Sequence, residues 1–114
     1  MKYDLEERCS VFWEHIIDLI TKVPRNIVTR PIISQLIRSS TSIWANYMEA
    51  NQASSPRDFK HKANISKKEA NESKHWIRML ARACPWIKEK CLKCWNEANE
   101  LTKIFYKIVQ NTKV

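Results

Sequence analysis

The sequence predicts an all-α protein, an antiparallel up-and-down four-helix bundle formed by a single domain that covers residues 1–114. Three observations support this fold class. Apolar and small residues recur at alternating three- and four-residue steps in four segments of the chain, as they do on one face of an α-helix. No segment alternates with the period of two that is typical of a β-strand. Short connections separate the last three segments, and short connections between long helices make neighbouring helices antiparallel.

The first predicted helix covers about residues 4–22 and the second about residues 31–52. Pro24 and Pro31 bracket the connection between them, because proline disrupts the interior of a helix. The residues of each helix that face the other helices form a stripe, which we call the seam. The predicted seams are Leu5, Cys9, Phe12, Ile16 and Leu19 on the first helix, and Ile33, Leu36, Ser40, Ile43, Tyr47 and Ala50 on the second.

The third predicted helix covers residues 56–83 and the fourth about residues 86–111. Ser55 offers an N-cap for the third helix, Pro56 a first-turn proline and Asp58 a capping-box acid, and Pro85 ends the helix. The predicted seams are Phe59, Ala63, Ser66, Ala70, Ser73, Ile77 and Leu80 on the third helix, and Ile87, Cys91, Cys94, Ala98, Leu101, Phe105 and Ile108 on the fourth. Small seam residues on the second and third helices predict that these two pack closely.

The composition excludes several classes of protein. The chain has no glycine, and therefore no glycine-rich loop that could cradle the phosphates of a nucleotide. No apolar run approaches the roughly 18 residues that cross a bilayer. The acidic N-terminal residues Asp4, Glu6 and Glu7 do not fit a signal peptide. We therefore expect a cytoplasmic protein without a membrane partner, whose four cysteines are reduced thiols.

The four cysteines are candidate metal ligands. Cys91 and Cys94 have the spacing of half a zinc site, which Cys9 and Cys84 would complete if their helices met at one end. Cys91 and Cys94 also occupy consecutive seam positions, where a thiol behaves as a small apolar side chain. The seam pattern therefore favours four structural cysteines and no zinc site.

One further motif could carry chemistry. Glu72 and His75 have the Glu-x-x-His spacing of di-iron bundles, but such a site needs two of these motifs and the chain has one. No serine, cysteine or lysine has a recognisable base and orienting group, so we predict no catalytic residue. With the zinc and di-iron sites disfavoured, we also predict no metal and no cofactor.

Glu49 and Glu69 lie next to seam residues and are predicted to be partly buried. A buried carboxylate needs a partner. We expect ion pairs with Arg38 or Lys68, or a hydrogen bond with Asn46, and a structural role for both glutamates.

A second apolar stripe runs beside the seam, and the chain thereby exceeds the roughly three apolar positions per heptad that a lone bundle needs. This surplus has two interpretations, a wide seam filled by tryptophan or an interface for an oligomer or another partner. The candidate interface residues are Ile37, Trp44, Met48, Trp76 and Met79.

The net charge of +8 is distributed unevenly. Residues 1–55 contain six basic and six acidic side chains, whereas residues 56–114 contain fourteen basic and six acidic ones. A basic surface of this kind attracts polyanions, although a lysine-rich helix face can also be merely solvated. The candidate nucleic-acid-binding residues lie off the seams of the third and fourth helices: Lys60, Lys67, Lys74, Arg78, Arg82, Lys88, Lys90 and Lys93. Lys103 and Lys107 also avoid the fourth seam.

The central stretch resembles a known family. Residues 35–43 (Gln-Leu-Ile-Arg-Ser-Ser-Thr-Ser-Ile) and 45–50 (Ala-Asn-Tyr-Met-Glu-Ala) are similar to the second-helix pattern of the S23 or 23S rRNA intervening-sequence proteins, relatives of the accessory variability protein of diversity-generating retroelements. Asp58-Phe59, Lys68-Glu69-Ala70 and residues 72–76 are similar to the third-helix pattern. Trp44 departs from the small residue expected there, and His75 from the usual tyrosine.

The resemblance implies a homopentamer of four-helix bundles around a central channel, without enzymatic activity. It also implies RNA or DNA as partners, and a reverse transcriptase for the retroelement relatives. Two functions follow as hypotheses. The first is an oligomeric, non-enzymatic protein that binds the RNA or DNA backbone through its basic helices. The alternative is a protein-protein adaptor or scaffold, for example for a reverse transcriptase, that does not itself bind nucleic acid.

Overall fold

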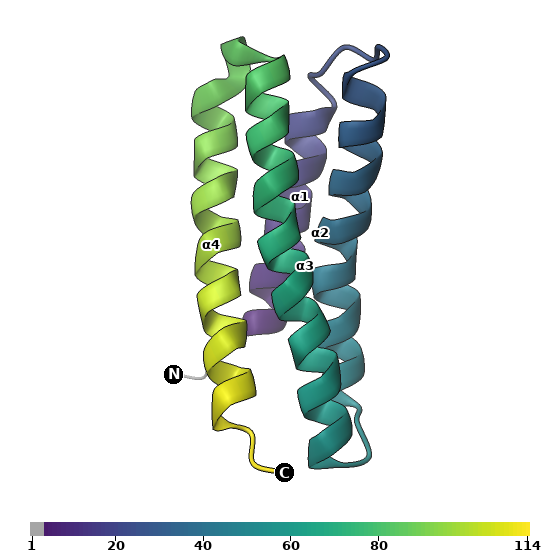
Figure 1. Cartoon of the computed structure of the whole chain (residues 1–114), viewed down its shortest axis with the longest axis vertical. Coiled ribbons are helices and arrows are strands. Elements are labelled where there is room, and N and C mark those ends of the chain that lie inside the picture. Colours follow the sequence, from purple (N-terminus) through teal and green to yellow (C-terminus); the bar gives the residue numbers. More distant parts are fainter. Residues whose placement is uncertain (1–3) are drawn as a thin grey trace.

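The computed structural model describes residues 4–114 and contains four α-helices. They are α1 (Leu5–Ile20), α2 (Thr29–Asn51), α3 (Pro56–Ala83) and α4 (Lys88–Asn111), with a short 3₁₀ helix, η1 (Pro85–Ile87), before α4. The helices run alternately up and down, and each packs against two neighbours, in the order α1, α2, α3, α4 and back to α1 (Figure 1). No strand occurs in residues 4–114. The predicted all-α, four-helix architecture is therefore confirmed. None of the helices in this range is long and apolar enough to cross a membrane.

Side-chain hydrogen bonds stabilise the starts of α1 and α2. The Asp4 carboxylate accepts a hydrogen bond from the Glu7 amide at 3.0 Å and caps α1. Helix α2 begins at Thr29, two residues before the predicted start at Pro31. The Asn26 side-chain oxygen accepts hydrogen bonds from the amides of Val28 and Thr29, each at 2.9 Å. Because these amides already have a partner, the helix can begin ahead of the proline.

The other two helices follow the predicted boundaries closely. Helix α3 has the predicted bounds, and the Ser55 hydroxyl accepts a hydrogen bond from the Asp58 amide at 3.1 Å. Pro56 occupies the first turn, as expected from its missing N–H group. Helix α4 begins at Lys88 rather than at residue 86, because Pro85–Ile87 form the 3₁₀ turn η1 instead.

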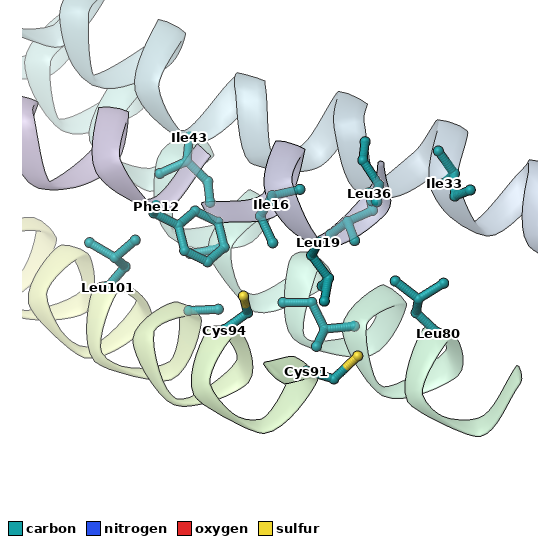
Figure 2. Close-up of a cluster of buried hydrophobic side chains, with 14 of the residues drawn as sticks. Phe12, Ile16, Leu19, Ile33, Leu36, Ile43, Leu80, Cys91, Cys94 and Leu101 are labelled. Carbon is teal, nitrogen blue, oxygen red and sulfur yellow. The ribbon is translucent and has the colours of Figure 1, made fainter. Parts of the chain in front are cut away.

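The predicted seams form the core. Every predicted seam residue is buried except Tyr47, Phe59 and Ile108, which are partly buried. Figure 2 shows side chains of all four helices meeting there, with Phe12 and Ile16 of α1 among residues of α2 and α4. Apart from a few buried hydroxyl side chains, the interior is apolar, and most of it consists of side chains that the three- and four-residue periodicity identified.

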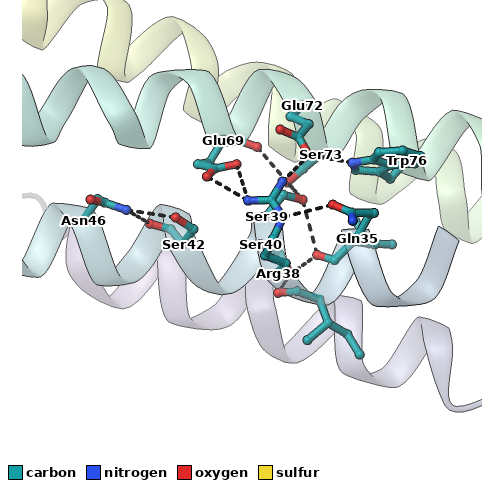
Figure 3. Close-up of polar contacts among 12 residues, drawn as sticks. Gln35, Arg38, Ser39, Ser40, Ser42, Asn46, Glu69, Glu72, Ser73 and Trp76 are labelled. Carbon is teal, nitrogen blue, oxygen red and sulfur yellow. Dashed lines mark hydrogen bonds and ion pairs between the residues drawn. The ribbon is translucent and has the colours of Figure 1, made fainter. Parts of the chain in front are cut away.

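A polar interface lies between α2 and α3. The Ser66 hydroxyl donates a hydrogen bond to the Ile43 carbonyl across the interface at 3.0 Å, and the hydroxyls of Ser39 and Ser73 lie 2.8 Å apart. Figure 3 shows Ser39 and Ser73 together with a network at the surface edge of the same interface. Small side chains allow two helices to approach, and here the serine hydroxyls also have partners, so burial leaves them satisfied.

The network at that edge is centred on Arg38. Its guanidinium donates to both carboxylate oxygens of Glu69, at 3.0 and 3.2 Å, and also pairs with Glu72 (Figure 3). The Trp76 indole N–H donates to Glu72 at 2.8 Å. The predicted ion pair of Glu69 with Arg38 is thus confirmed. The Glu72 carboxylate thus pairs with Arg38 and Trp76. Within residues 4–114, it does not belong to a group of three or more side chains that could hold a metal ion.

The prediction for Glu49 is wrong. Its side chain is exposed and pairs with Lys62 at 2.7 Å, not with Arg38, Lys68 or Asn46. Asn46 instead donates to the Ser42 carbonyl at 2.9 Å. Adjacent positions on a helix are about 100° apart, so the neighbour of a seam residue can lie on the flank of the helix and reach solvent.

Candidate nucleic-acid interface

Two basic grooves lie between α3 and α4. The larger has a volume of about 700 Å³, and we call it the Tyr106 groove. It is lined by Lys67, Lys68, Asn71, Thr102, Lys103, Tyr106, Lys107, Gln110 and Asn111. The smaller, of about 300 Å³, is called the Trp95 groove and is lined by Ile77, Arg78, Ala81, Lys88, Cys91, Leu92 and Trp95. Neither lining, as the structure describes it, includes an acidic residue.

Helical periodicity places these residues on facing flanks. Lys67, Asn71, Lys74 and Arg78 follow one another at steps of three and four residues, so they share one side of α3. Positions 88, 92, 95, 99, 103 and 106 recur in the same way on α4. Because α3 and α4 are antiparallel neighbours, a row of basic side chains on one helix faces a row of aromatic, amide and basic side chains on the other.

Tyr106 is held in a defined position at the surface. Its side chain is 53% exposed. The Lys67 ammonium lies over the ring, with Nζ 5.7 Å from the ring centroid. The Gln110 amide nitrogen donates a hydrogen bond to the tyrosine oxygen at 2.7 Å. The ring therefore has a cation on it and a fixed hydroxyl, and it remains open to solvent.

Trp95 repeats this arrangement three helical turns earlier. The Lys74 ammonium lies 5.3 Å from the centroid of the indole and donates to the Asn99 side-chain oxygen at 3.0 Å. Trp95 itself is partly buried and packs against the core. Lys67 and Lys74 lie off the seam of α3 as predicted, and both are partly buried against aromatic rings of α4.

The carboxylates of α3 and α4 mostly point to other sides. Glu69 and Glu72 contact Arg38 of α2. Glu97 forms a bidentate pair with Arg8 of α1, with the nitrogens at 2.6 and 2.7 Å. Glu100 pairs with Lys103 at 3.4 Å, at the edge of the Tyr106 groove. The α3–α4 flank thus retains an excess of positive charge that acids of the same helices do not neutralise.

The eight predicted basic residues do not form one surface. Lys67, Arg78 and Lys88 line the two α3–α4 grooves, and Lys74 lies between these grooves. Lys60 and Arg82 lie outside both linings, near the two ends of α3.

Lys90 and Lys93 line a different groove, of about 480 Å³, between α1 and α4. Lys22 lines the same groove, and His15, Asp18 and Glu97 add to its mixed charge. The neighbouring Lys22 ammonium, then desolvation and the charge of Lys93, lower the pKa of Lys90. This groove contains acidic residues, so it differs in charge from the α3–α4 flank.

Of the four lysines and the tyrosine that line the Tyr106 groove, only Lys67 is among the predicted nucleic-acid-binding residues. Lys103 and Lys107 were predicted only to lie off the fourth seam, and Lys68 and Tyr106 were not assigned to this site. The signal was present, because Tyr106 is an aromatic residue off the seam, next to one lysine and three residues after another. The sequence predicts Lys68 only as a possible ion-pair partner of Glu49 or Glu69. Glu69 pairs with Arg38 instead (Figure 3).

The predicted interface residues also divide between two surfaces. Ile37, Trp44 and Met48 share the side of α2 opposite Ser39, which contacts α3. Trp76 lies on the α3 flank next to α2, as its hydrogen bond to Glu72 shows, and Met79 follows it by three residues. Ile37 is exposed, and the other four are partly buried.

The cysteines have the properties of core residues. All four are buried and free of disulfide bonds. Burial raises the pKa of Cys9 to about 12 and the pKa of Cys91 and of Cys94 to about 11. It also raises the pKa of Cys84. These thiols therefore stay protonated near neutral pH, as expected of cysteines in an apolar core. No group of three or more histidine, cysteine or acidic side chains suited to a metal occurs in residues 4–114.

Known proteins share this sequence pattern and fold. The family model of the 23S rRNA-intervening sequence protein matches residues 2–107. A solved structure of a protein of unknown function from the S23 ribosomal protein family of Bacteroides thetaiotaomicron is similar, with a TM-score of 0.83 and 30% sequence identity over 95% of this chain and 100% of that chain. No curated protein matches the sequence. Since the family model extends over nearly the whole chain and the four-helix fold agrees with it, this protein belongs to the 23S rRNA-intervening sequence protein family.

Proposed function

We propose that this protein is a non-enzymatic nucleic-acid-binding protein that holds the backbone of RNA or DNA along the α3–α4 flank. The observation that carries the proposal is the lining of the Tyr106 groove, where four lysines surround an exposed tyrosine without an acidic residue among them. Lysine ammonium groups bind phosphates by charge, and groove-lining amides can hydrogen-bond to sugars or bases. Backbone contacts of this kind position a nucleic acid without reading its sequence.

Oligomerisation would strengthen such binding. We propose a homopentamer, as the family resemblance implies, with the exposed Ile37 and its neighbours Trp44 and Met48 at the contact between copies. Five copies would carry a net charge of about +40 and would attract a polyanion from a distance. Several α3–α4 flanks in one ring would also bind one long strand with higher avidity than a single flank.

A second candidate function rests on the same α2 side. Ile37 is 39% exposed, and Trp44 and Met48 are only partly buried, so this stripe offers apolar area to another protein. In this alternative the protein is an adaptor, for example for a reverse transcriptase, and its basic flank is solvated surface. The two functions depend on different sides of the bundle, so substitutions can separate them.

The test is a titration of the purified, nuclease-treated protein against labelled structured RNA and duplex DNA at about 50 and 200 mM salt. We expect binding to weaken steeply as salt increases, since each phosphate contact releases counterions. The double variant Lys67→Glu with Lys107→Glu should weaken binding strongly and reduce the salt slope by about 1 for each contact that is lost.

The matched control is Lys90→Glu with Lys93→Glu, which changes the net charge equally but lies in the α1–α4 groove. This control should keep most of the affinity. Equal losses in both variants would indicate a general charge effect and would contradict the assignment to the α3–α4 flank. Weak binding of the unmodified protein to both nucleic acids at low salt would favour the adaptor function.

A further inference from the structure

We infer that the Tyr106 groove binds unpaired nucleotides, with one base stacked on the Tyr106 ring and the neighbouring phosphates on the surrounding lysines. This inference rests on the proposed function, because it assigns a class of nucleic acid, the single strand, to the same groove. Backbone binding alone requires only positive charge. The aromatic ring at the centre of the charge cluster is an additional feature that a paired duplex would not use.

The ring is prepared for stacking. More than half of the Tyr106 side chain is exposed, although it lies in a groove between two helices. The hydrogen bond from Gln110 restrains the hydroxyl, and the Lys67 ammonium rests against the ring. A base that stacks on a ring already held in place requires less ordering of the protein on binding.

The lysines are arranged to receive the phosphates on either side of such a base. Lys67 and Lys68 extend from α3, whereas Lys103 and Lys107 extend from α4, so cations flank Tyr106 from both helices. The groove volume of about 700 Å³ lies within the range of small-ligand sites and can accommodate a nucleotide. The side-chain amides of Asn71, Gln110 and Asn111 line it as well and can hydrogen-bond to a base edge or a sugar.

The second ring extends the site along the flank. Trp95 lies eleven residues before Tyr106 on α4, which corresponds to about 16 Å along the helix axis. Each ring has a lysine of α3 over it. Aromatic side chains beside basic ones are the usual design of proteins that bind single strands without sequence preference. Trp95 is partly buried in the core, so Tyr106 is the more accessible platform.

A duplex would meet the groove differently. Its bases are stacked on one another and their faces are covered, so only its phosphates could reach the lysines. Single strands should therefore gain a contact that duplexes lack. The test compares three labelled probes at about 50 mM salt: a 12-nucleotide oligo-dT, an abasic strand of the same length and charge, and a 12-base-pair duplex. Oligo-U is measured beside oligo-dT to compare RNA with DNA.

The variant Tyr106→Ala removes the ring, and Tyr106→Phe retains it. Trp86→Ala is the matched control, because Trp86 is even more exposed, at 67%, but lies on η1 outside both basic grooves. We expect the unmodified protein, Tyr106→Phe and Trp86→Ala to bind oligo-dT at least about tenfold more tightly than the abasic strand. In Tyr106→Ala this preference should disappear, while affinity for the abasic strand and the duplex stays within about twofold.

The outcomes separate the two proposals. Equal affinity of the unmodified protein for oligo-dT and the abasic strand would overturn the stacking inference, as would an undiminished preference in Tyr106→Ala. Salt-dependent binding that the charge reversals at Lys67 and Lys107 abolish would still leave the proposed function in place. Failure of all probes to bind at low salt would overturn both.

Discussion

The hydroxyl oxygens of Ser39 and Ser73 lie 2.8 Å apart in the buried interface between α2 and α3. The Ser73 hydroxyl also donates to the Glu69 carbonyl at 2.9 Å, so its single hydrogen is used and Ser39 is the donor of the bond between the two helices. Both side chains are fully buried, and the close approach of the helices depends on their small size.

This contact predicts that size matters more than polarity at position 73. Ser73→Ala removes an acceptor, but the Ser39 hydroxyl can turn to the Leu36 carbonyl 3.4 Å away, so the free energy of unfolding should fall by about 1 kcal/mol. Ser73→Leu adds the cost of overpacking, a further 1–3 kcal/mol or so. Urea denaturation measures both values. If the leucine variant were as stable as the alanine variant, the α2–α3 interface would accommodate a larger side chain, which would contradict the prediction of overpacking.

The Arg38–Glu72 pair predicts a dependence of stability on acid pH. The hydrogen bond from Trp76, and then Arg38, lower the pKa of Glu72 below its ordinary value of 4.5. The unfolded chain therefore takes up a proton before the folded chain does, and the stability is present above about pH 4.5 and is lost as the pH falls through the lowered pKa.

Glu72→Gln should therefore cost up to roughly 1 kcal/mol at pH 7, a modest value because the pair is partly solvated, and the difference from the unmodified protein should shrink below about pH 4. Urea denaturation at pH 7, 5 and 3 tests this. Glu100→Gln, which removes an exposed pair on α4, is the control and should have little effect at any of these pH values. A pH-independent cost for Glu72→Gln would contradict the assigned cause.

The buried thiols predict low reactivity and a loss of stability in alkali. The folded chain keeps protons on Cys9, Cys91 and Cys94 at a pH where the unfolded chain, with thiol pKa values near 9.0, releases them. Because their pKa values are raised on folding, stability should be retained below about pH 9 and should fall as the pH rises above it.

Reaction with iodoacetamide at pH 8 provides the measurement. All four cysteines should remain unmodified in the native protein and should react completely in urea, as mass spectrometry would show. Rapid native labelling of one cysteine would reveal local opening around that residue, or a thiol with an ordinary pKa.

The proposed oligomer predicts that a charge on the α2 stripe blocks assembly. Ile37 is 39% exposed in the single chain, so Ile37→Asp should leave the helical content nearly unchanged. Burying the new carboxylate between copies would be costly, and the mass measured by light scattering should decrease towards that of one chain. Leu92→Asp, at a 57% exposed position of α4 outside the candidate interface, is the control and should retain the assembly. A monomeric unmodified protein at tens of micromolar would contradict the pentamer.

Most of the fold was predictable because the helices are regular and amphipathic. The three- and four-residue steps directly identify seam residues such as Ile16, Leu36, Leu80 and Leu101, one from each helix. Ser55 with Pro56 identifies the start of α3. The start of α2 was less predictable, since it depends on an Asn26 side chain that reaches along the chain to two amides. Such a bond depends on the conformation of the loop.

The candidate site was only partly predictable. Periodicity places Lys67 and Lys90 off their seams, but it does not say which neighbouring helix each one faces. The packing of the helices determines which neighbour each lysine faces. Lys67 lies over the Tyr106 ring of α4, whereas Lys90 lies beside Lys22, which follows α1. Glu69 and Glu97 were counted in the local charge balance, yet both point to arginines of other helices. Net charge along the sequence therefore differs from charge on a surface.

The lengths and packing of the helices imply the order in which they unfold locally. Helix α1 has 16 residues, whereas α3 and α4 have 28 and 24, and α1 packs less extensively on its neighbours than α3 does. Local opening begins where the fewest buried contacts hold an element. We therefore expect the amide hydrogens of α1 to exchange with solvent before those of α2, α3 and α4, with the three longer helices remaining as the slowest-exchanging unit.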